Sequence, residues 1–222
     1  MQKLPKIKIV YEDNHLLVVE KPSNIPVQED SSKDIDMITL LKEYRKTNEN
    51  KPGEAYIGLV HRLDRPVSGI MVFAKTSKAA SRLSDQIRQN KFQKTYLAVV
   101  ENSLPQKGKL EDYLTKNEKE NKSYITTKEK GKYSCLEYKV LSAKDNISLV
   151  EINLITGRSH QIRVQFSSRG NPLNGDSKYG SNPNNIDIAL FAKSITFIHP
   201  TTKEKLTFTL NIPNKYPFNI FK

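Results

Sequence analysis

The residues best suited to chemistry lie together in the stretch HRLDRPVSG, residues 61–69. A single carboxylate, Asp64, is surrounded there by His61, Arg62 and Arg65. An Asp in a loop between strands is most often a turn former, since its side chain bonds nearby backbone N–H groups. The stretch therefore leaves two interpretations open. Asp64 is either a neutralised loop residue or a carboxylate that is kept ionised for a reaction.

Three later stretches hold side chains suited to a binding site: KTYLAVV, GRSHQIRV and NPLNGDSKYG. The first places Tyr96 inside an apolar strand. The second puts four polar side chains at a strand-to-helix junction, where free backbone N–H groups favour anions; they are Arg158, His160, Gln161 and Arg163. In the third, a glycine-rich loop, we expect Asp176 and Tyr179 to pin the loop rather than to react.

In this order the stretches HRLDRPVSGIMVFAK, KTYLAVV, GRSHQIRV and GDSKYG resemble the RluA-type family of RNA pseudouridine synthases. The resemblance extends from YEDNHLLVVEKPSNIPV to FTL, nearly the whole chain. It implies an α+β fold: a curved, mainly antiparallel mixed β-sheet flanked by helices and loops, with a central catalytic cleft. It also implies isomerisation of uridine to pseudouridine in RNA by one aspartate, without cofactor or metal.

The resemblance assigns roles to five residues that match the motifs of the family. Asp64 corresponds to the catalytic aspartate, and Tyr96 to the aromatic residue that stacks on the target uracil. Arg163 matches the ion-pair partner of the aspartate, and Ile162 matches the residue that packs beside the base. Arg62 resembles the arginine that replaces the flipped base in the RNA stack. The alternatives are a core aromatic for Tyr96, a structural ion pair for Arg163 and a phosphate contact for Arg62.

The other polar residues of the motifs are expected to order the site or to contact RNA. We expect His61 to stabilise its loop by hydrogen bonding rather than to carry protons, and Arg65 to contact phosphate. Arg158, His160 and Gln161 either order the cleft or touch RNA.

Two departures from the family pattern affect loop shape and substrate preference rather than the reaction. Val67-Ser68-Gly69 stands where Thr-Ser-Gly is common, and Ser23-Asn24 follows Lys-Pro where a small residue and Gly are usual.

The composition fits a protein that binds a polyanion. The chain has 222 residues with 36 Lys+Arg against 24 Asp+Glu, a net charge of +12, which favours nucleic acid first and anionic membrane second. A lysine-rich proteome would give the same balance. Cys135 is the only cysteine and is expected to be a buried, inert thiol, so no disulfide or Cys-based metal site is predicted. His15 and His199 have no partners at metal-ligand spacing, and we expect structural roles for both.

The order of the predicted elements indicates a mainly antiparallel α+β domain. The resemblance implies that residues 1–222 form a single catalytic domain, without the separate N-terminal RNA-binding domain that some members of the family carry. Asp34 and Ser77 are expected to cap helices, the Lys-rich segment 107–132 to form a solvated hairpin, and 48–54 and 171–185 to be loops. Helices are predicted at 35–47, at 78–90 and within 159–170. Strands are predicted at 7–13, 15–22, 55–60, 69–76, 92–101, 108–115, 123–129, 133–143, 147–156, 189–200 and 204–210.

Neither a signal peptide nor an apolar run of membrane-spanning length is present in the sequence, so we expect a cytoplasmic protein, by default a monomer. Its partner is expected to be structured RNA, ribosomal before transfer RNA. Three other classes of function compete with this one. A non-catalytic RNA-binding module has no use for an anion where phosphates approach. A glycosidase normally supplies a second carboxylate. HRLD resembles a kinase catalytic loop, but the glycine-rich phosphate loop and Asp-Phe-Gly are missing from the sequence.

Overall fold

The computed structural model describes residues 5–49, 55–180 and 187–222. Part of the predicted loops at 48–54 and 171–185 lies outside these residues. The chain forms two compact units, one made of the residues up to Phe92 with Ser194–Leu210, the other of Gln93–Lys193 with Asn211–Lys222. That both units act as one catalytic domain stays a prediction.

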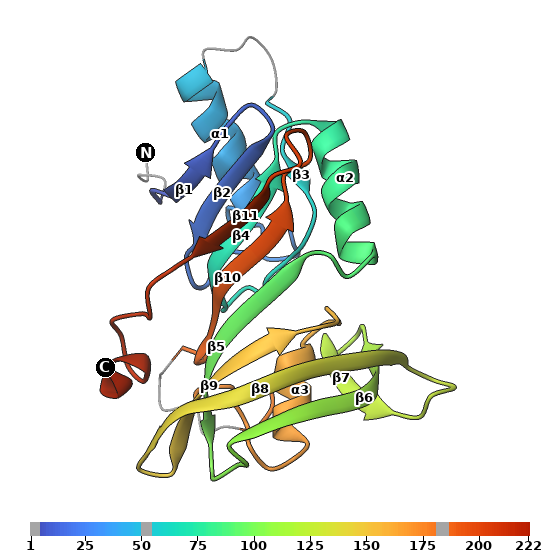
Figure 1. Ribbon diagram of the computed structural model, residues 1–222, viewed down its shortest axis with the longest axis vertical. Helices are drawn as coiled ribbons and strands as arrows, with labels where there is room; N and C mark the ends of the chain where they lie inside the picture. The colour runs from blue at the N-terminus through green and yellow to red at the C-terminus, as the bar shows by residue number, and fades with distance from the viewer. Residues whose placement is uncertain (1–4, 50–54, 181–186) are drawn as a thin grey trace. The chain divides into compact units, whose positions relative to one another are not determined.

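The first unit is built on strands β1 (Lys8–Glu12), β2 (Leu16–Lys21), β3 (Gly58–Leu59), β4 (Ser68–Ala74) and β11 (Lys205–Thr209). Strand β10 (Leu190–Ile198) begins in the second unit and ends in the first. The order is β1-β2-β4-β10, with β3 paired to β4 and β11 to β10. Helices α1 (Met37–Glu49) and α2 (Ser77–Arg88) belong to the same unit as these strands (Figure 1).

Strands β2 and β4 form the centre of the first unit. They pair antiparallel, with Val18 opposite Val72, and the runs 16–19 and 70–74 are fully buried. Continuous burial along a strand requires cover on both faces. The two apolar runs predicted as strands are therefore confirmed as the core that carries the loop between β3 and β4.

Both predicted helices of the first unit are present, but neither predicted cap is right. Asp36, not Asp34, caps α1: its Oδ1 accepts from the backbone N–H groups of Ile38 and Thr39 at 2.9 and 3.2 Å. Thr76, not Ser77, caps α2, because its Oγ1 accepts from Ala79 N at 3.2 Å. The residue that caps the helix lies two positions from the expected one in α1 and one position from it in α2, within the error of one to two residues usual for helix ends.

His199 has the structural role expected of it. Its Nε2 bonds Asp13 Oδ2 at 2.9 Å, and its Nδ1 accepts from the backbone of Thr201 and Thr202 at 3.2 and 2.9 Å. The neutral ring therefore carries its proton on Nε2 and ties the β1–β2 turn to the β10–β11 turn.

The second unit is an antiparallel sheet with one helix against it. Its strands run in the order β10-β5-β9-β8-β6-β7, and helix α3 (Gln161–Ser167) packs on β6 and β7 (Figure 1). A 3₁₀ turn, Phe218–Phe221, lies near the C-terminus. The strands are β5 (Gln93–Glu101), β6 (Lys107–Asn117), β7 (Lys122–Thr126), β8 (Lys132–Lys144) and β9 (Ile147–Leu154).

The mainly antiparallel α+β class is confirmed by these pairings. The predicted hairpin in 107–132 corresponds to β6 and β7, with its lysines largely exposed. Cys135 is buried, with 2% of its surface accessible.

Candidate active site

Asp64 lies in a short loop between β3 and β4 that two buried residues anchor. Leu63 and Val67 are buried, with 7% and 1% of their surfaces exposed, while Asp64 between them is half-buried. The Asp64 carbonyl accepts from Val67 N at 2.9 Å, which closes a turn. Gly69 then enters β4 with φ 127°, a conformation that suits glycine and few other residues. The loop is thereby fixed at both ends.

Lys21 binds the backbone of this loop. Its side chain is fully buried, and Nζ donates to three backbone carbonyls: those of Pro22 at 2.9 Å, Arg65 at 2.9 Å and Val67 at 2.8 Å. Burial lowers the pKa of Lys21 to about 7; the nearby Asp64 carboxylate opposes this and the Arg65 charge adds to it. An ammonium can satisfy all three carbonyls, whereas a neutral amine has only two N–H groups.

The sequence interpretation missed Lys21 because a Lys at the end of an apolar run is usually read as an exposed strand end. Lys21 shares a face with Val19 and Leu17, and both of those are buried. Strand alternation alone does not single Lys21 out, because Leu16 and Val18 on the opposite face are as buried as the residues on the Lys21 face.

His61 positions the same loop, as expected. Its Nε2 accepts the backbone N–H of Val72 at 3.1 Å, and its ring packs against Phe92 with centroids 5.3 Å apart. An Nε2 that accepts this bond carries no proton, so the ring acts here as an acceptor of a strand N–H.

The two arginines beside Asp64 in sequence have different environments. Arg62 is exposed, in keeping with a contact to RNA. Arg65 donates to the Asn24 carbonyl at 3.2 Å and to Ser32 Oγ at 2.9 Å, and also to Asp34. Through these bonds Arg65 connects the loop before α1 to the Asp64 loop. The phosphate contact predicted for Arg65 would compete with them. The bonds from Arg65 and Ser32 lower the pKa of the Asp34 carboxyl.

Tyr96 and α3 belong to the second unit. Tyr96 is 7% exposed and stands on β5 opposite Ile152, which in turn lies opposite Tyr138. The Tyr138 ring contacts Phe166 of α3 at 5.3 Å. Tyr96 therefore projects from the sheet face that carries α3.

Arg163 is held by a carboxylate from the following loop. Its Nε and Nη2 donate to Asp176 Oδ2 and Oδ1 at 2.8 and 2.7 Å. The side chains are 7% and 1% exposed, so this is a buried, two-point ion pair. Asp176 thus pins its loop to α3, as expected. Asp64 and Arg163 belong to different units, and the ion pair between them stays a prediction.

Tyr179 connects Arg163 to strand β7. Its hydroxyl accepts from Ser123 N at 2.7 Å and bonds His160 Nδ1 at 2.9 Å. The Arg163 guanidinium and the Lys122 ammonium lie 5.1 and 5.2 Å from the centre of its ring. Burial raises the pKa of Tyr179, against the opposing influence of the Ser123 bond and the Arg163 charge. Its phenol therefore stays neutral at physiological pH.

Gln161 organises the junction before α3. Its Oε1 accepts from Thr156 Oγ1 at 2.8 Å and from Arg158 N at 3.0 Å, and its Nε2 donates to the Cys135 carbonyl at 3.1 Å. Arg158 is exposed, and its Nε donates to the Tyr133 carbonyl at 3.0 Å. Of the two expectations for this junction, Gln161 fits ordering and Arg158 remains accessible to RNA.

Within the described residues, no group of His, Cys, Asp or Glu side chains is arranged to hold a metal ion. Over the same part of the chain, no helix has the length and apolar character needed to cross a membrane.

Comparison with solved structures defines the fold. A human structure, RNA pseudouridylate synthase domain containing 4, matches with a TM-score of 0.80 at 22% identity, covering 93% of this chain and 88% of that chain. This is the fold of the RNA pseudouridylate synthases. The model of the RNA pseudouridylate synthase family also matches residues 15–168, so the chain belongs to that family.

Two relatives are named as modifiers of the large ribosomal subunit. Pseudouridine synthase C of Buchnera aphidicola subsp. Baizongia pistaciae is 34% identical over 212 residues, covering 90% of this chain and 65% of its own length. Pseudouridine synthase D of Zymomonas mobilis is 32% identical over 225 residues, covering 96% of this chain and 71% of its own length. The chain thus spans 65% of the first relative.

Proposed function

We propose that this protein is an RNA pseudouridine synthase that isomerises specific uridines of structured RNA, using Asp64 and no cofactor or metal. The observation that carries the proposal is that Asp64 lies in the matched family region, on a loop fixed by Lys21, His61 and Gly69. A carboxylate that must meet one sugar or base needs a fixed loop.

The reaction moves the ribose bond of uracil from nitrogen to carbon. The N1–C1′ bond breaks, the base turns, and a C5–C1′ bond forms; C5 loses a proton and N1 gains one, so atoms balance without a co-reactant. Three paths are open for Asp64: attack on the ribose, attack on the uracil ring, or abstraction of a proton as a general base. The residues do not select among them. A single Asp with an aromatic beside it suits isomerisation better than hydrolysis, which normally uses two carboxylates.

The other residues place the base. A stacked base must be flipped out, at a cost of a few kcal/mol, and stacking on Tyr96 returns about 1–3 kcal/mol. Ile162 packs beside the base, and the exposed Arg62 fills the vacated stack. Arg163, already oriented by Asp176, pairs with Asp64 and keeps it ionised. The exposed Arg158 adds an RNA contact, while Arg65, His160 and Gln161 order the loops around the site.

The relatives' names point to ribosomal RNA of the large subunit as the substrate, with transfer RNA second. The monomeric state and cytoplasmic location expected from the sequence stay predictions.

The test compares wild type with Asp64→Asn on unmodified ribosomal and transfer RNA transcripts, mapping pseudouridine by chemical adducts. We expect product from wild type in the presence of a metal chelator, and none from Asp64→Asn, because an amide neither attacks nor accepts a proton. The Asn variant should keep RNA affinity and melting temperature. Pseudouridine from Asp64→Asn would refute the assignment of Asp64. Binding without product would favour an RNA-binding module, and release of free uracil a glycosidase.

A further inference from the structure

The outer edge of strand β7 carries an exposed aromatic beside lysines. Tyr124 is 39% exposed, and the Lys122 ammonium lies 5.6 Å from the centre of its ring. Lys178 Nζ donates to the Asn121 carbonyl at 3.0 Å and so holds the turn that precedes β7. We call Lys122, Tyr124 and Lys178 the β7 edge. In the strand order of the described residues β7 is terminal, so this edge has no further strand beside it.

The β7 edge is connected directly to the residues around Arg163. Lys122 and Arg163 contact the same Tyr179 ring. Ser123, next to Lys122, donates its N–H to the Tyr179 hydroxyl and its Oγ to the Ser159 carbonyl at 2.7 Å each. One aromatic ring therefore separates the β7 edge from the guanidinium assigned to the reaction. A polymeric ligand with one residue at Arg163 would therefore bring its adjacent residues to the β7 edge.

The chemistry of the edge fits nucleic acid better than protein. Residues 116–132 contain six Lys and three Glu, a net charge of +3. Lys116 is paired to Glu118 at 2.5 Å, and Tyr124 donates to Glu120, so acidic groups here are already engaged. Lysine amines pair with phosphates, and an exposed ring offers a stacking surface to any base.

We propose that the β7 edge binds the RNA strand beside the target nucleotide, with Lys122 on a phosphate and Tyr124 stacked on an unpaired base. This rests on the proposed function, since the target nucleotide is defined by that reaction. Lys178 takes part by positioning the turn through Asn121.

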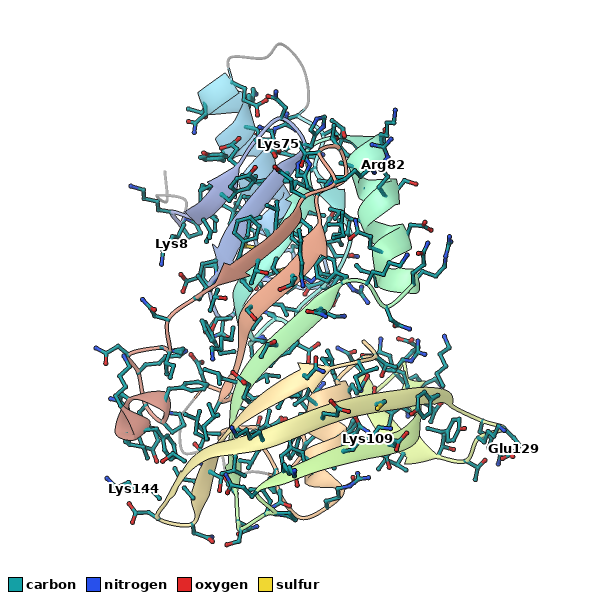
Figure 2. The ribbon with its side chains drawn as sticks, viewed as in Figure 1. Lys8, Lys75, Arg82, Lys109, Glu129 and Lys144 are labelled. Carbon is teal, nitrogen blue, oxygen red and sulfur yellow. The ribbon has the colours of Figure 1, made fainter. Side chains whose placement is uncertain are left out.

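The test measures binding of an unmodified transcript of large-subunit ribosomal RNA at several salt concentrations. The variants are Lys122→Gln, Tyr124→Ala and Tyr124→Phe. The matched control is Lys144→Gln, which replaces an exposed lysine at the C-terminal end of β8, the end away from β7 (Figure 2). Melting temperatures are recorded for each, because Lys122 also packs on Tyr179, whereas Tyr124 is exposed and its truncation should leave folding intact.

For Lys122→Gln we expect affinity to fall about three- to tenfold, with a salt slope smaller by about 1, since one phosphate contact is lost. For Tyr124→Ala we expect a loss of about fivefold or more, with Tyr124→Phe close to wild type. In turnover assays the larger change should fall on KM rather than kcat.

Equal binding by Lys122→Gln, Tyr124→Ala and Lys144→Gln would overturn the proposal. An effect of one variant alone would overturn the contact assigned to the other residue. Failure of the proposed function is distinguishable, because wild type would then bind the transcript and form no pseudouridine, while the binding comparison would still be readable.

Discussion

Replacing Lys21 by Met probes the support of the Asp64 loop, and its effect on stability depends on pH. Lys21 is fully buried, and burial lowers its pKa from 10.5 to about 7. The unfolded chain, with the ordinary pKa, therefore binds more protons than the folded protein between pH 7 and 10.5. Stability due to Lys21 rises with pH across that window and is constant below it, because both states are then protonated.

The size of the effect follows from the same two pKa values. Over each pH unit in which the unfolded state binds one more proton than the folded state, the free energy of unfolding rises by about 1.4 kcal/mol. Near pH 7 the folded Lys21 is half protonated, so the gain from pH 7 to 9 is about 2 kcal/mol. The free energy of unfolding of wild type minus that of Lys21→Met should grow by this amount. Other titrating groups contribute equally to both proteins and cancel.

Urea denaturation of both proteins at pH 6, 7, 8 and 9 measures this difference, with the exposed Lys144→Met as control. Met has similar volume but donates nothing to the carbonyls of Pro22, Arg65 and Val67. We therefore also expect kcat for pseudouridine formation to fall by about tenfold or more, with little change in KM, because the Asp64 loop is less fixed. A difference in unfolding free energy that stays constant from pH 6 to 9 would refute the lowered pKa. An unchanged kcat would show that Asp64 does not depend on Lys21.

Two further substitutions test the second unit. Asp176→Asn should lower the free energy of unfolding by about 3 kcal/mol, because the buried two-point ion pair between Arg163 and Asp176 is replaced by a contact to a neutral amide; urea denaturation measures this, and a loss below about 1 kcal/mol would contradict the burial of the pair. Tyr179→Phe should cost about 1–2 kcal/mol, since the Ser123 N–H loses its acceptor. Faster hydrogen exchange at the Ser123 amide is the specific readout, and unchanged protection there would argue against the bond.

The fold class and the central strands could be predicted from sequence because their signal is local. The apolar runs of β2 and β4 need burial wherever they are placed, and the alternation in β9 identifies its apolar face. Helix starts were less well predicted. Asp34 and Asp36 are equally good caps by composition; in the structure Asp36 caps α1 and Asp34 bonds Arg65 instead. That contact joins residues distant in sequence, which no local pattern contains.

The roles of the candidate site residues stay predictions, whereas several of the contacts that support them are observed. Motif matching supplied Asp64, Tyr96 and Arg163. His61 and Asp176 were expected to stabilise their loops, whereas the role of Lys21 and the wider role of Tyr179 were not foreseen, because both act through long-range contacts. Lys21 reaches the carbonyls of Arg65 and Val67, more than 40 positions away. Tyr179 was expected only to pin its own loop, yet it connects β7 to α3.

The cations near Asp64 show how misleading sequence proximity is for electrostatics. Arg65, the adjacent residue, directs its guanidinium to Asp34, Ser32 and the Asn24 carbonyl. Lys21, distant in sequence, donates its ammonium N–H groups to the carbonyls of Arg65 and Val67 within the loop and to that of Pro22. Both cations therefore fix the path of the backbone, and a fixed path determines where the carboxylate can meet its substrate. Removing either should harm placement of Asp64 more than its charge, whereas removing Arg163 should affect the charge that the reaction requires.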